Sequence, residues 1–273
     1  MQNISEGLRM KDKKIGFVPT MGYLHKGHLK LVKECRKRSD VVIVSIFVNP
    51  VQFGPKEDFN SYPRDLNRDI EMLKKLNVDY IFIPDVKEMY PKGYSVYVEP
   101  TGGIVNSLCG FSRPGHFRGV ATVVAKLFNI VKPHISFFGK KDFQQSIVIK
   151  RIVKDLNFSI DIVIVKTVRE KDGLAMSSRN KYLSDEERKS ALVLYKSLNI
   201  ARNMIKSGER KVSIIINSMK EMIKNEHSAK INYISIVNAD TLEKLKEATG
   251  NVLIALAVKI GKTRLIDNLT IKC

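Results

Sequence analysis

Two histidines, three residues apart, stand where a short apolar run gives way to a helical pattern. His25 and His28 occur in the stretch PTMGYLHKGHLKLV, and their spacing is close to one helical turn, so both imidazoles can face the same way. The start of a helix offers unpaired N–H groups and partial positive charge, and imidazoles can donate hydrogen bonds or act as acids. The pattern predicts a seat for an anion, although two surface histidines at a helix start would look the same.

A zinc site is less favoured at this turn, because no Glu or Cys lies nearby at ligand spacing. Gly27, between the two histidines, would let the backbone approach a ligand closely. The chain has neither a Gly-x-x-x-x-Gly-Lys-Ser/Thr phosphate loop nor a Gly-x-Gly-x-x-Gly fingerprint. The ordinary P-loop and dinucleotide-binding classes are therefore excluded.

Two amide side chains follow the unbroken, β-branched run DVVIVSIFV at 40–48. Asn49 and Gln52 stand at the end of this expected strand, where amides can orient a hydroxyl or carboxylate group without adding charge. An Asn-Pro turn with a solvated glutamine is the alternative. Further along, Arg113, His116 and Arg118 lie before or at a helix start, and either an anion-handling surface or domain-linking ion pairs would explain them equally well.

A basic cluster follows another short apolar run, in the stretch FFGKKDFQQ. Lys140 or Lys141 could neutralise phosphate charge, and Asp142 could hold a lysine or a metal ion. Two lysines in a row are also common in solvated turns. The later stretch AMSSRN offers two hydroxyls, several backbone donors and one permanent cation, which suits a mobile clamp over a polyphosphate, or an exposed interdomain linker.

The elements that must position these groups alternate between strands and helices. Strands are expected at 14–18, 40–48, 78–84, 134–139 and 161–167, and helices at 28–38, 63–76, 117–131 and 144–157. This alternation predicts an α/β fold with a parallel sheet covered by helices on both faces. The polar clusters at 19–28, 49–54, 139–145 and 168–180 all follow strands, so we expect them at the carboxyl rim, where such sheets bind ligands.

The pattern changes after residue 180. Ser184 and Glu187 form a capping-box signature that opens a helix through about residue 206, and another helix is expected at 212–226. Strands follow at 231–237, 251–258 and 263–271, with a helical pattern in TLEKLKEA. We therefore expect two domains, a nucleotide-binding domain at 1–176 and a smaller α+β domain at 177–273, with the AMSSRN loop as hinge or lid.

Composition narrows the class of protein further. The 273 residues are 44% apolar and 27% charged, with no apolar run near the roughly 20 residues of a membrane span and no signal-peptide shape, so a cytoplasmic, membrane-free protein is expected. Cys35, Cys109 and Cys273 are too far apart to predict a disulfide framework. The net charge of +19 comes from scattered lysines and there is no Trp, which argues against a specific nucleic-acid partner.

Five ordered blocks resemble the pantothenate synthetase (pantoate–β-alanine ligase) family. They are PTMGYLHKGH, VSIFVNPVQFGPKEDF, RPGHFRGVATVV, FGKKDFQQ and VREKDGLAMSSRNKYLS, and the likeness runs from about residue 14 to the C-terminus. The resemblance implies a Rossmann-like, doubly wound parallel sheet with a His-x-Gly-His motif, a smaller C-terminal domain and a homodimer. It also implies that pantoate and β-alanine are joined at the expense of ATP, with Mg²⁺, through a pantoyl adenylate, releasing AMP and pyrophosphate.

The resemblance also assigns residues. Catalytic roles would fall to His28, as the acid, and to His25, Lys141 and Arg179. Pantoate would be held by Gln52, Gln145 and Asn49, and β-alanine by Gln52. The ATP site would comprise Met21, Gly22, Tyr23, Leu24, His25, Lys26, Gly27, His28, Gly139, Lys140, Lys141, Asp142, Val168, Met176, Ser177, Ser178 and Arg179. Mg²⁺ would be held mainly by the ATP phosphates, with Asp142 as the candidate protein ligand.

Two features depart from the family pattern. Leu108-Cys109-Gly110 stands where the family commonly has Leu-Glu-Gly, so we expect no acidic role there, and the opening strand and helix are shortened by several residues. The alternative function is that of another nucleotidylyltransferase of the same superfamily, acting on a phosphorylated acceptor. The neutral Gln52 and Gln145 favour instead an acceptor with hydroxyls and a single carboxylate.

Overall fold

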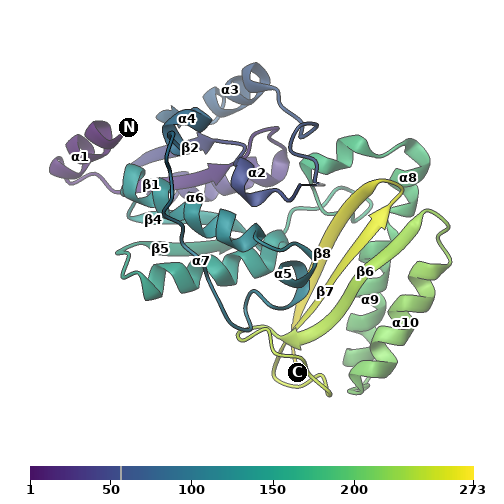
Figure 1. Cartoon of the computed structure of the whole chain (residues 1–273). Helices are drawn as coiled ribbons and strands as arrows, with labels where there is room; N and C mark the ends of the chain where they lie inside the picture. Colours follow the sequence, from purple (N-terminus) through teal and green to yellow (C-terminus); the bar gives the residue numbers. More distant parts are fainter. Residues whose placement is uncertain (56) are drawn as a thin grey trace. The chain divides into compact units, whose positions relative to one another are not determined.

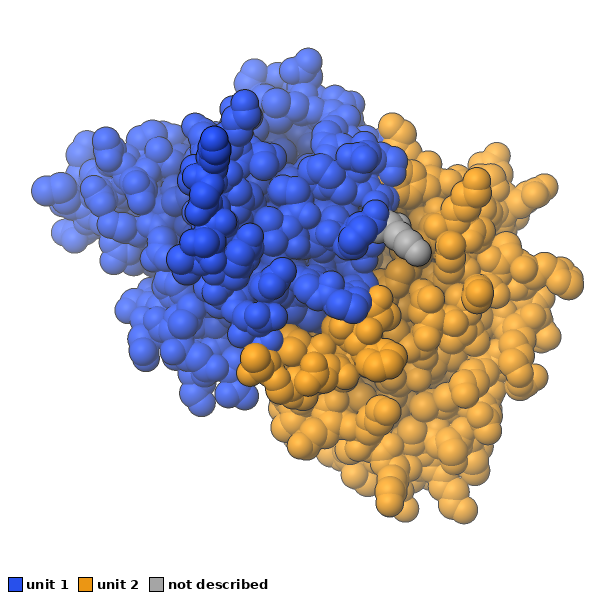
Figure 2. Space-filling model, viewed as in Figure 1, with its two compact units in different colours: residues 1–100, 113–140, 145–168 blue, residues 101–112, 141–144, 169–273 orange. Residues whose placement is uncertain are grey.

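The computed structural model describes residues 1–55 and 57–273, and these fall into two compact units (Figure 2). Unit 1 comprises residues 1–100, 113–140 and 145–168, and unit 2 comprises residues 101–112, 141–144 and 169–273. The chain passes from one unit to the other at five junctions, after Pro100, Ser112, Lys140, Gln144 and Val168. The boundary between residues 176 and 177 that the sequence predicts stays a prediction.

Unit 1 is built on a parallel five-stranded sheet with strand order β3-β2-β1-β4-β5 (Figure 1). The strands are β1 (Ile15–Thr20), β2 (Val41–Ile46), β3 (Tyr80–Phe82), β4 (Ile135–Gly139) and β5 (Asp161–Val165). The chain winds outward from β1 through β2 to β3, then returns to β4 on the other side of β1 and continues to β5. This confirms the predicted Rossmann-like, doubly wound sheet, whose winding reverses between β1 and β4.

Helices cover both faces of this sheet. The helical segments of unit 1 are α1 (Gln2–Met10), α2 (Lys26–Arg36), η1 (Pro50–Gln52), α3 (Leu66–Lys74), α4 (Val86–Met89), α6 (His116–Val131) and α7 (Phe143–Asp155), of which the first two residues of α7 count with unit 2. Phe137 of β4 packs in one core cluster with Leu31 and Val32 of α2, whereas the Phe138 ring meets the Phe128 ring of α6 at 6.4 Å. Since successive strand residues point to opposite faces, α2 and α6 lie on opposite faces.

Close approach of α2 to the central strand requires Gly16. A Cβ atom built on Gly16 would lie well inside contact distance of the Cys35 and Ser39 side chains, at the C-terminal end of α2 and just beyond it. Val32 and Cys35 are fully buried against the sheet at this point. The lack of a side chain at residue 16 therefore allows the close packing of α2, which carries His28, against β1.

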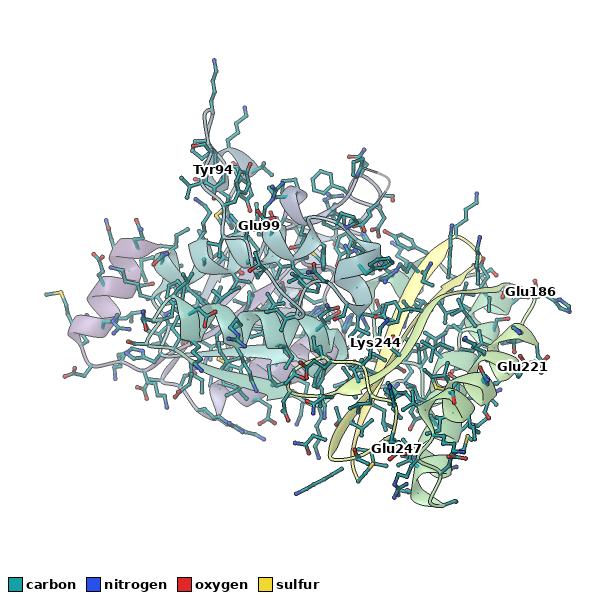
Figure 3. The ribbon with its side chains drawn as sticks, turned by 60° about the horizontal axis from the view of Figure 1, so that its bottom comes forward. Tyr94, Glu99, Glu186, Glu221, Lys244 and Glu247 are labelled. Carbon is teal, nitrogen blue, oxygen red and sulfur yellow. The ribbon has the colours of Figure 1, made fainter. Side chains whose placement is uncertain are left out.

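Unit 2 is built on an antiparallel sheet with strand order β6-β7-β8. Its strands are β6 (Ala229–Asn238), β7 (Asn251–Ile260) and β8 (Thr263–Lys272), and its helical segments are α5 (Leu108–Ser112), η2 (Lys140–Asp142, of which Lys140 counts with unit 1), η3 (Ser178–Tyr182), α8 (Asp185–Ser190), α9 (Val193–Lys206) and α10 (Val212–Lys224). The core lies between the sheet and α9 and α10, where Leu198, Ile215 and Leu256 are fully buried. Glu186 of α8 and Glu221 of α10 project outward (Figure 3).

Two predicted elements of unit 2 are wrong. The helix expected from residue 184 to 206 begins with the predicted capping box of Ser184 and Glu187 but is broken into α8 and α9. At the break the N–H of Leu194 donates to the carbonyl of Ala191, a tighter turn that redirects the chain and lets both residues be buried.

The second wrong element is the helix expected in TLEKLKEA. Leu242 has a left-handed φ of 62°, and the N–H of Leu245 donates to the carbonyl of Ile236 on β6, so the segment runs as turns along the sheet. Leu242 and Ala248 are buried from this path. Leu242, Leu245 and Ala248 are three residues apart, as on one face of a helix, but the chain packs them against the sheet without forming a helix.

Other differences are smaller. The sequence predicts no helix at 2–10, yet α1 forms there, and its Glu6 pairs with Lys132 at 2.7 Å. The short helices α4 and α5 are also unpredicted, and α2 begins at Lys26 rather than His28. Among the residues that the structure describes, none of the helices combines the length and apolar character that a bilayer crossing requires.

Gly16→Ala should lower the free energy of unfolding by about 1–3 kcal/mol, because the added methyl group overpacks the contact between β1 and α2. Urea unfolding followed by circular dichroism measures this. The control is Gly7→Ala in α1, where nothing lies within 4 Å of the added Cβ; its stability should be unchanged or higher by up to about 1 kcal/mol. Equal stability of Gly16→Ala and the natural protein would contradict the proposed seating of α2.

Candidate active site

The turn after β1 leads the chain from the sheet into α2. Thr20 Oγ1 donates to the carbonyl of Ser45 at 2.8 Å and accepts the N–H of Gly22 at 3.2 Å, which fixes where the turn starts. Gly22 and Tyr23 both have left-handed backbones, with φ of 79° and 48°. Such a conformation suits glycine and is unfavourable for tyrosine, so surrounding contacts must hold the turn.

His25 and His28 open α2 and cap each other. His25 is the N-cap, its Nδ1 accepts the N–H of Gly27 at 3.1 Å, and Nδ1 of His28 accepts the N–H of His25 at 3.3 Å. The rings stack with centroids 4.0 Å apart. Because both Nδ1 atoms accept, the proton of each neutral ring sits on Nε2. The pair therefore presents two imidazole N–H donors at a helix start, which suits anionic oxygens.

Asp69 of α3 holds the turn from the other side. Its two carboxylate oxygens accept the N–H groups of Tyr23 at 2.6 Å and Leu24 at 2.7 Å, and its side chain is only 1% exposed. Burial raises the pKa of Asp69, although the two N–H donors oppose this. Arg68 donates to the carbonyl of Leu24 at 2.9 Å and lies over the Tyr23 ring. The sequence pattern of α3 gave no signal for this role, since Asp69 lies far along the chain from the turn.

Asn49 and Gln52 lie together just beyond β2. Asn49 donates to Gln52 Oε1 at 3.2 Å and to the carbonyl of Gly119 at 3.0 Å, while its Oδ1 accepts from the Tyr90 hydroxyl at 2.8 Å. Nε2 of Gln52 lies 2.9 Å from Sδ of Met21, in the turn after β1. Unit 1 thus brings together the predicted residues Met21, Asn49 and Gln52. Within it, Asn49 positions Gln52, and direct contact of Asn49 with pantoate stays a prediction.

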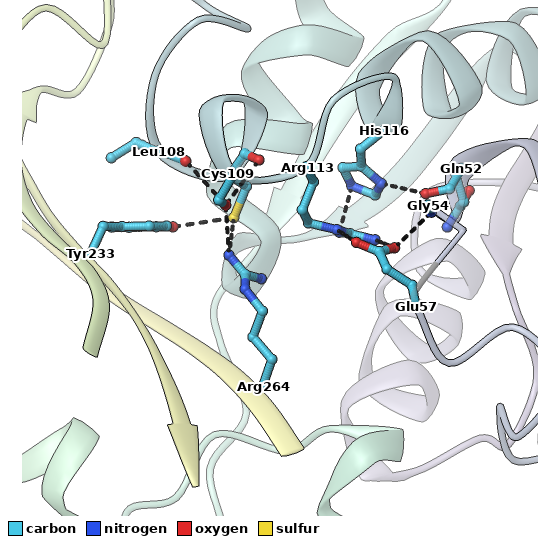
Figure 4. A network of polar contacts seen from close by, with 10 residues as sticks. Gln52, Gly54, Glu57, Leu108, Cys109, Arg113, His116, Tyr233 and Arg264 are labelled. Carbon is cyan, nitrogen blue, oxygen red and sulfur yellow. Dashed lines mark hydrogen bonds and ion pairs between the residues drawn. The ribbon is translucent and has the colours of Figure 1, made fainter. Parts of the chain in front are cut away.

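A polar network fixes the backbone of Gln52 (Figure 4). Glu57 and Arg113 form two hydrogen bonds of 2.6 Å, Arg113 Nη1 lies 2.9 Å from His116 Nε2, and His116 Nδ1 lies 2.9 Å from the carbonyl of Gln52. In the neutral tautomer with its proton on Nδ1, His116 donates to Gln52 and accepts from Arg113. The ion pair of Arg113 with Glu57 lies within unit 1 and so does not link the two units, and an anion-handling role for Arg113, His116 and Arg118 stays a prediction.

Burial and close packing reinforce this network. Burial by itself would raise the pKa of Glu57, but the hydrogen bonds and charge of Arg113 outweigh it, so the pKa lies below its usual value. A Cβ atom on Gly119 of α6 would lie 2.5 Å from the Gln52 backbone, so α6 and the Gln52 loop are in direct backbone contact. Glu57 and Gly119 are site-supporting residues for which the sequence offered no separate signal.

The lysines after β4 meet different surroundings. Gly139 pairs with Val165 across β4 and β5, so Lys140 and Lys166 directly follow neighbouring strand ends. Burial, followed by the charge of Lys166, lowers the pKa of Lys140. Gln145 lies in the first turn of α7. Two lysines at adjacent carboxyl ends form a positively charged part of the rim of unit 1, and Lys166 was not predicted.

The next residues of the chain belong to unit 2. The carbonyl of Lys141 accepts from Asn268 Nδ2 of β8 at 2.7 Å, and Lys141 Nζ lies 3.8 Å from Asp142 Oδ1. Asp142 is half-exposed. The backbone of Lys141 is therefore fixed by a buried amide that the sequence analysis did not single out.

The stretch after Val168 is anchored to the same strand. Arg169 makes two hydrogen bonds to the buried Asp267 of β8, at 2.6 and 2.9 Å, and its guanidinium lies 4.1 Å from the centre of the Tyr195 ring. Arg188 bonds Glu170 at 2.8 Å, which ties the stretch to α8. These ion pairs hold the base of the loop that leads to Met176–Arg179.

The predicted clamp residues themselves lie at the start of η3. The Ser177 side chain accepts the N–H of Arg179 at 3.3 Å, and Asn180 donates to the carbonyl of Ala175 and to Glu170, both at 3.1 Å. Ser178 is buried and Arg179 is partly exposed. Unit 2 thus carries Lys141, Asp142 and residues 176–179 on short, hydrogen-bonded segments.

Cys109, where the family commonly has Glu, lies in α5. Its Sγ is 3.2 Å from the Tyr233 hydroxyl and 3.5 Å from Arg264 Nη2 (Figure 4). Its N–H donates to Gln144 Oε1 at 2.9 Å. The buried thiol touches polar partners but brings no carboxylate to Arg264. We assign it no acidic role, as the sequence predicts.

Comparison with known proteins gives a consistent match over the whole chain. The family model described as Pantoate-beta-alanine ligase matches residues 1–270. A relative named pantothenate synthetase, from Fervidobacterium nodosum, is 58% identical over 273 residues, which are 100% of this chain and 97% of the relative. A relative of the same name from Caldicellulosiruptor bescii is 56% identical over 272 residues, 100% of this chain and 96% of that protein.

Solved structures agree with these relatives. The crystal structure of pantothenate synthetase from Thermus thermophilus has a TM-score of 0.93 at 45% identity, covering 97% of this chain and 96% of that one. The pantoate–β-alanine ligase of Francisella tularensis, complexed with beta-gamma ATP and β-alanine, has a TM-score of 0.82 at 42% identity, covering 98% and 93%. The present chain therefore belongs to the pantoate–β-alanine ligase family.

Proposed function

We propose that this protein joins pantoate to β-alanine in an ATP-dependent reaction that passes through pantoyl adenylate and releases AMP and pyrophosphate. It is thus an amide-forming ligase of pantothenate biosynthesis. The observation that carries this proposal is the pair of stacked imidazoles, His25 and His28, at the start of α2 and in the same unit as Gln52. Family membership over residues 1–270 supports it.

The first step activates the carboxylate of pantoate. A carboxylate is a poor acyl donor, and attack of its oxygen on the α-phosphorus of ATP forms the anhydride while the bond to pyrophosphate breaks. Negative charge then grows on the departing phosphate oxygens, so donors and cations must already be in place. The Nε2–H groups of His25 and His28, with Lys141 and Arg179, are proposed to supply them, His28 as the acid.

Neutral amides are proposed to hold the acceptor. Gln52 and Gln145 would bind the hydroxyls and carboxylate of pantoate, with Asn49 beside them, and Gln52 would also reach β-alanine. The Asn49 contact and the His116 contact to the Gln52 backbone support this role, because they fix Gln52 without adding charge to the acceptor site. A phosphorylated acceptor, as in the alternative nucleotidylyltransferase reaction, would need more cations and is not favoured.

In the second step the amine of β-alanine attacks the pantoyl carbonyl, an amide bond forms and AMP leaves. Holding anhydride and amine side by side is worth an effective concentration of about 10⁵ M or more in well-aligned cases, provided that water is excluded. Residues 176–179 are proposed to shield the adenylate. The segments from Met21 to His28 and from Gly139 to Asp142, with Val168, would complete the nucleotide site.

Mg²⁺ is proposed to reach this site chiefly with the nucleotide. Among residues 1–55 and 57–273, no group of three or more His, Cys, Asp or Glu side chains is arranged to hold a metal ion. A single carboxylate, with Asp142 as the candidate, fits an ion that is held mainly by phosphate oxygens and water. Once bound there, Mg²⁺ would polarise phosphoryl oxygens and offset their charge. The homodimer, the cytoplasmic location and the lack of a specific nucleic-acid partner stay predictions.

The whole reaction is tested by mixing the protein with ATP, Mg²⁺, D-pantoate and β-alanine, omitting each in turn, and measuring AMP and pyrophosphate exchange. AMP release should need all four, whereas exchange of labelled pyrophosphate into ATP should need pantoate but not β-alanine. Exchange that proceeds without pantoate, or that demands a phosphorylated acceptor, would favour the alternative reaction.

His28→Ala should keep the fold but lose pantoyl-adenylate formation by about 10²-fold or more, the usual cost of removing a charge-stabilising donor. Pyrophosphate exchange measures the step, and circular dichroism checks the fold. His227→Ala, which removes an imidazole in unit 2, away from the predicted site residues in sequence, is the control and should leave exchange unchanged. Near-normal exchange by His28→Ala would exclude the proposed role.

Glu57→Gln should lower the free energy of unfolding by about 1–3 kcal/mol at pH 7, because Arg113 loses a charged partner. Since Arg113 lowers the pKa of Glu57 below its usual 4.5, this stabilisation is complete above that value and fades as the pH falls through the lowered pKa. Urea unfolding of both proteins from pH 7 to pH 3 should therefore show the difference shrinking below about pH 4.5. A constant difference would show that Glu57 acts by packing alone.

A further inference from the structure

We propose that Asp69 is a positioning residue for the adenylation step, acting through the turn that presents His25 and His28. The inference rests on the proposed function, since it assigns a role within that same site. Asp69 itself lies on α3, outside the five sequence blocks that carry the family resemblance, and its hydrogen bonds go to the backbone of the turn.

Both carboxylate oxygens of Asp69 take part in the contact with the turn. Oδ2 accepts the N–H of Tyr23 at 2.6 Å and Oδ1 accepts the N–H of Leu24 at 2.7 Å, so one carboxylate satisfies two successive backbone donors. Hydrogen bonds to an ionised acceptor are shorter and stronger than neutral ones. Because the side chain is 1% exposed, water cannot replace these bonds if they are lost.

The turn needs this support because its backbone is unfavourable without it. Tyr23 has a φ of 48°, a left-handed conformation that costs a non-glycine residue about 1–2 kcal/mol. Such a residue persists where its surroundings over-determine it. Arg68, the neighbour of Asp69, completes the grip by donating to the carbonyl of Leu24 at 2.9 Å and lying 4.9 Å from the centre of the Tyr23 ring.

The held residues lead directly into the catalytic pair. Leu24 precedes His25, whose backbone N–H bonds His28 and whose Nδ1 bonds Gly27. A shift of the turn therefore moves both imidazoles together, along with the N–H groups at the start of α2. Misplacement of catalytic groups by about 1 Å can cost on the order of 10²-fold in rate.

The chemistry requires a carboxylate rather than an amide. Two N–H donors face the side chain, and an asparagine offers them one oxygen and one NH₂ group, which is itself a donor. Asp69→Asn keeps the shape of the side chain but breaks one of the two bonds, because the NH₂ group of asparagine would face a backbone N–H group and both are donors. It is therefore a sharp test of positioning with little change in volume.

Asp69→Asn should lower kcat for pyrophosphate exchange by about 10- to 100-fold while leaving KM for pantoate within about twofold, since Asn49 and His116 still hold Gln52. The control is Asp155→Asn at the exposed end of α7, which makes the same charge change and should leave kcat unaltered. A purely structural role would instead lower stability and the amount of active enzyme, with kcat per active site unchanged.

A double-mutant cycle identifies the route. In the His28→Ala background, Asp69→Asn should cost only about twofold more, because much of what Asp69 positions is already absent. Independent, multiplicative losses would overturn the inference, as would an Asp69→Asn protein with natural kcat. If Asp69→Asn fails to fold, Arg68→Met, at a half-exposed position, tests the same turn and should lower kcat about 3- to 10-fold. An unaltered kcat there would also overturn it.

These outcomes are separable from failure of the proposed function. If the natural protein shows no pantoate-dependent pyrophosphate exchange, the proposed reaction is wrong whatever Asp69 does. If the natural protein is active and the Asp69 and Arg68 variants have the same kcat for pyrophosphate exchange as the natural protein, the reaction stands and the positioning role is wrong.

Discussion

The pairing of β1 with β2 on one side and β4 on the other is the constraint on which the rest of unit 1 depends. Because all three strands run parallel, their carboxyl ends meet at one rim, and the winding reverses beside β1. The turn at 21–25, the amide pair after β2 and the lysine after β4 are thereby gathered from distant parts of the chain. Because Gly16 has no side chain, α2 can pack closely against the central strand β1.

Within each unit, buried polar groups hold partners on other elements. Asp69 accepts from the turn, His116 bridges Arg113 and the Gln52 backbone, and in unit 2 the neighbours Asp267 and Asn268 of β8 hold Arg169 and the backbone of Lys141. A buried polar group without a partner is costly, so each of these contacts fixes a geometry as well as removing a penalty. The groups expected to meet substrate are thus set in place by residues that would not touch it.

The alternation of β-branched runs with amphipathic segments was enough to predict the parallel sheet, because burial on both faces leaves a strong local pattern. The histidine spacing and the Ser184 capping box were equally local. What failed depended on distant contacts: TLEKLKEA has helical spacing, but Leu242 is buried in a turn with a left-handed backbone, and the N–H of Leu245 bonds the carbonyl of Ile236 on β6. Asp69 could not be found for the same reason, since its partners lie more than forty residues away and its own helix looks ordinary.

The five junctions at which the chain passes between its units bear on how the molecule folds. Units joined by a single linker can be cut apart, whereas here α5, residues 141–144 and the chain after Val168 are interleaved in sequence with segments of unit 1. A fragment that starts at residue 177 would lack α5, which contacts β6 and β7, and Gln144, which hydrogen-bonds α5. Unit 2 therefore draws residues 101–112 and 141–144 from within the stretch that builds unit 1, so neither unit is one continuous piece of chain, and we expect the whole chain to unfold cooperatively.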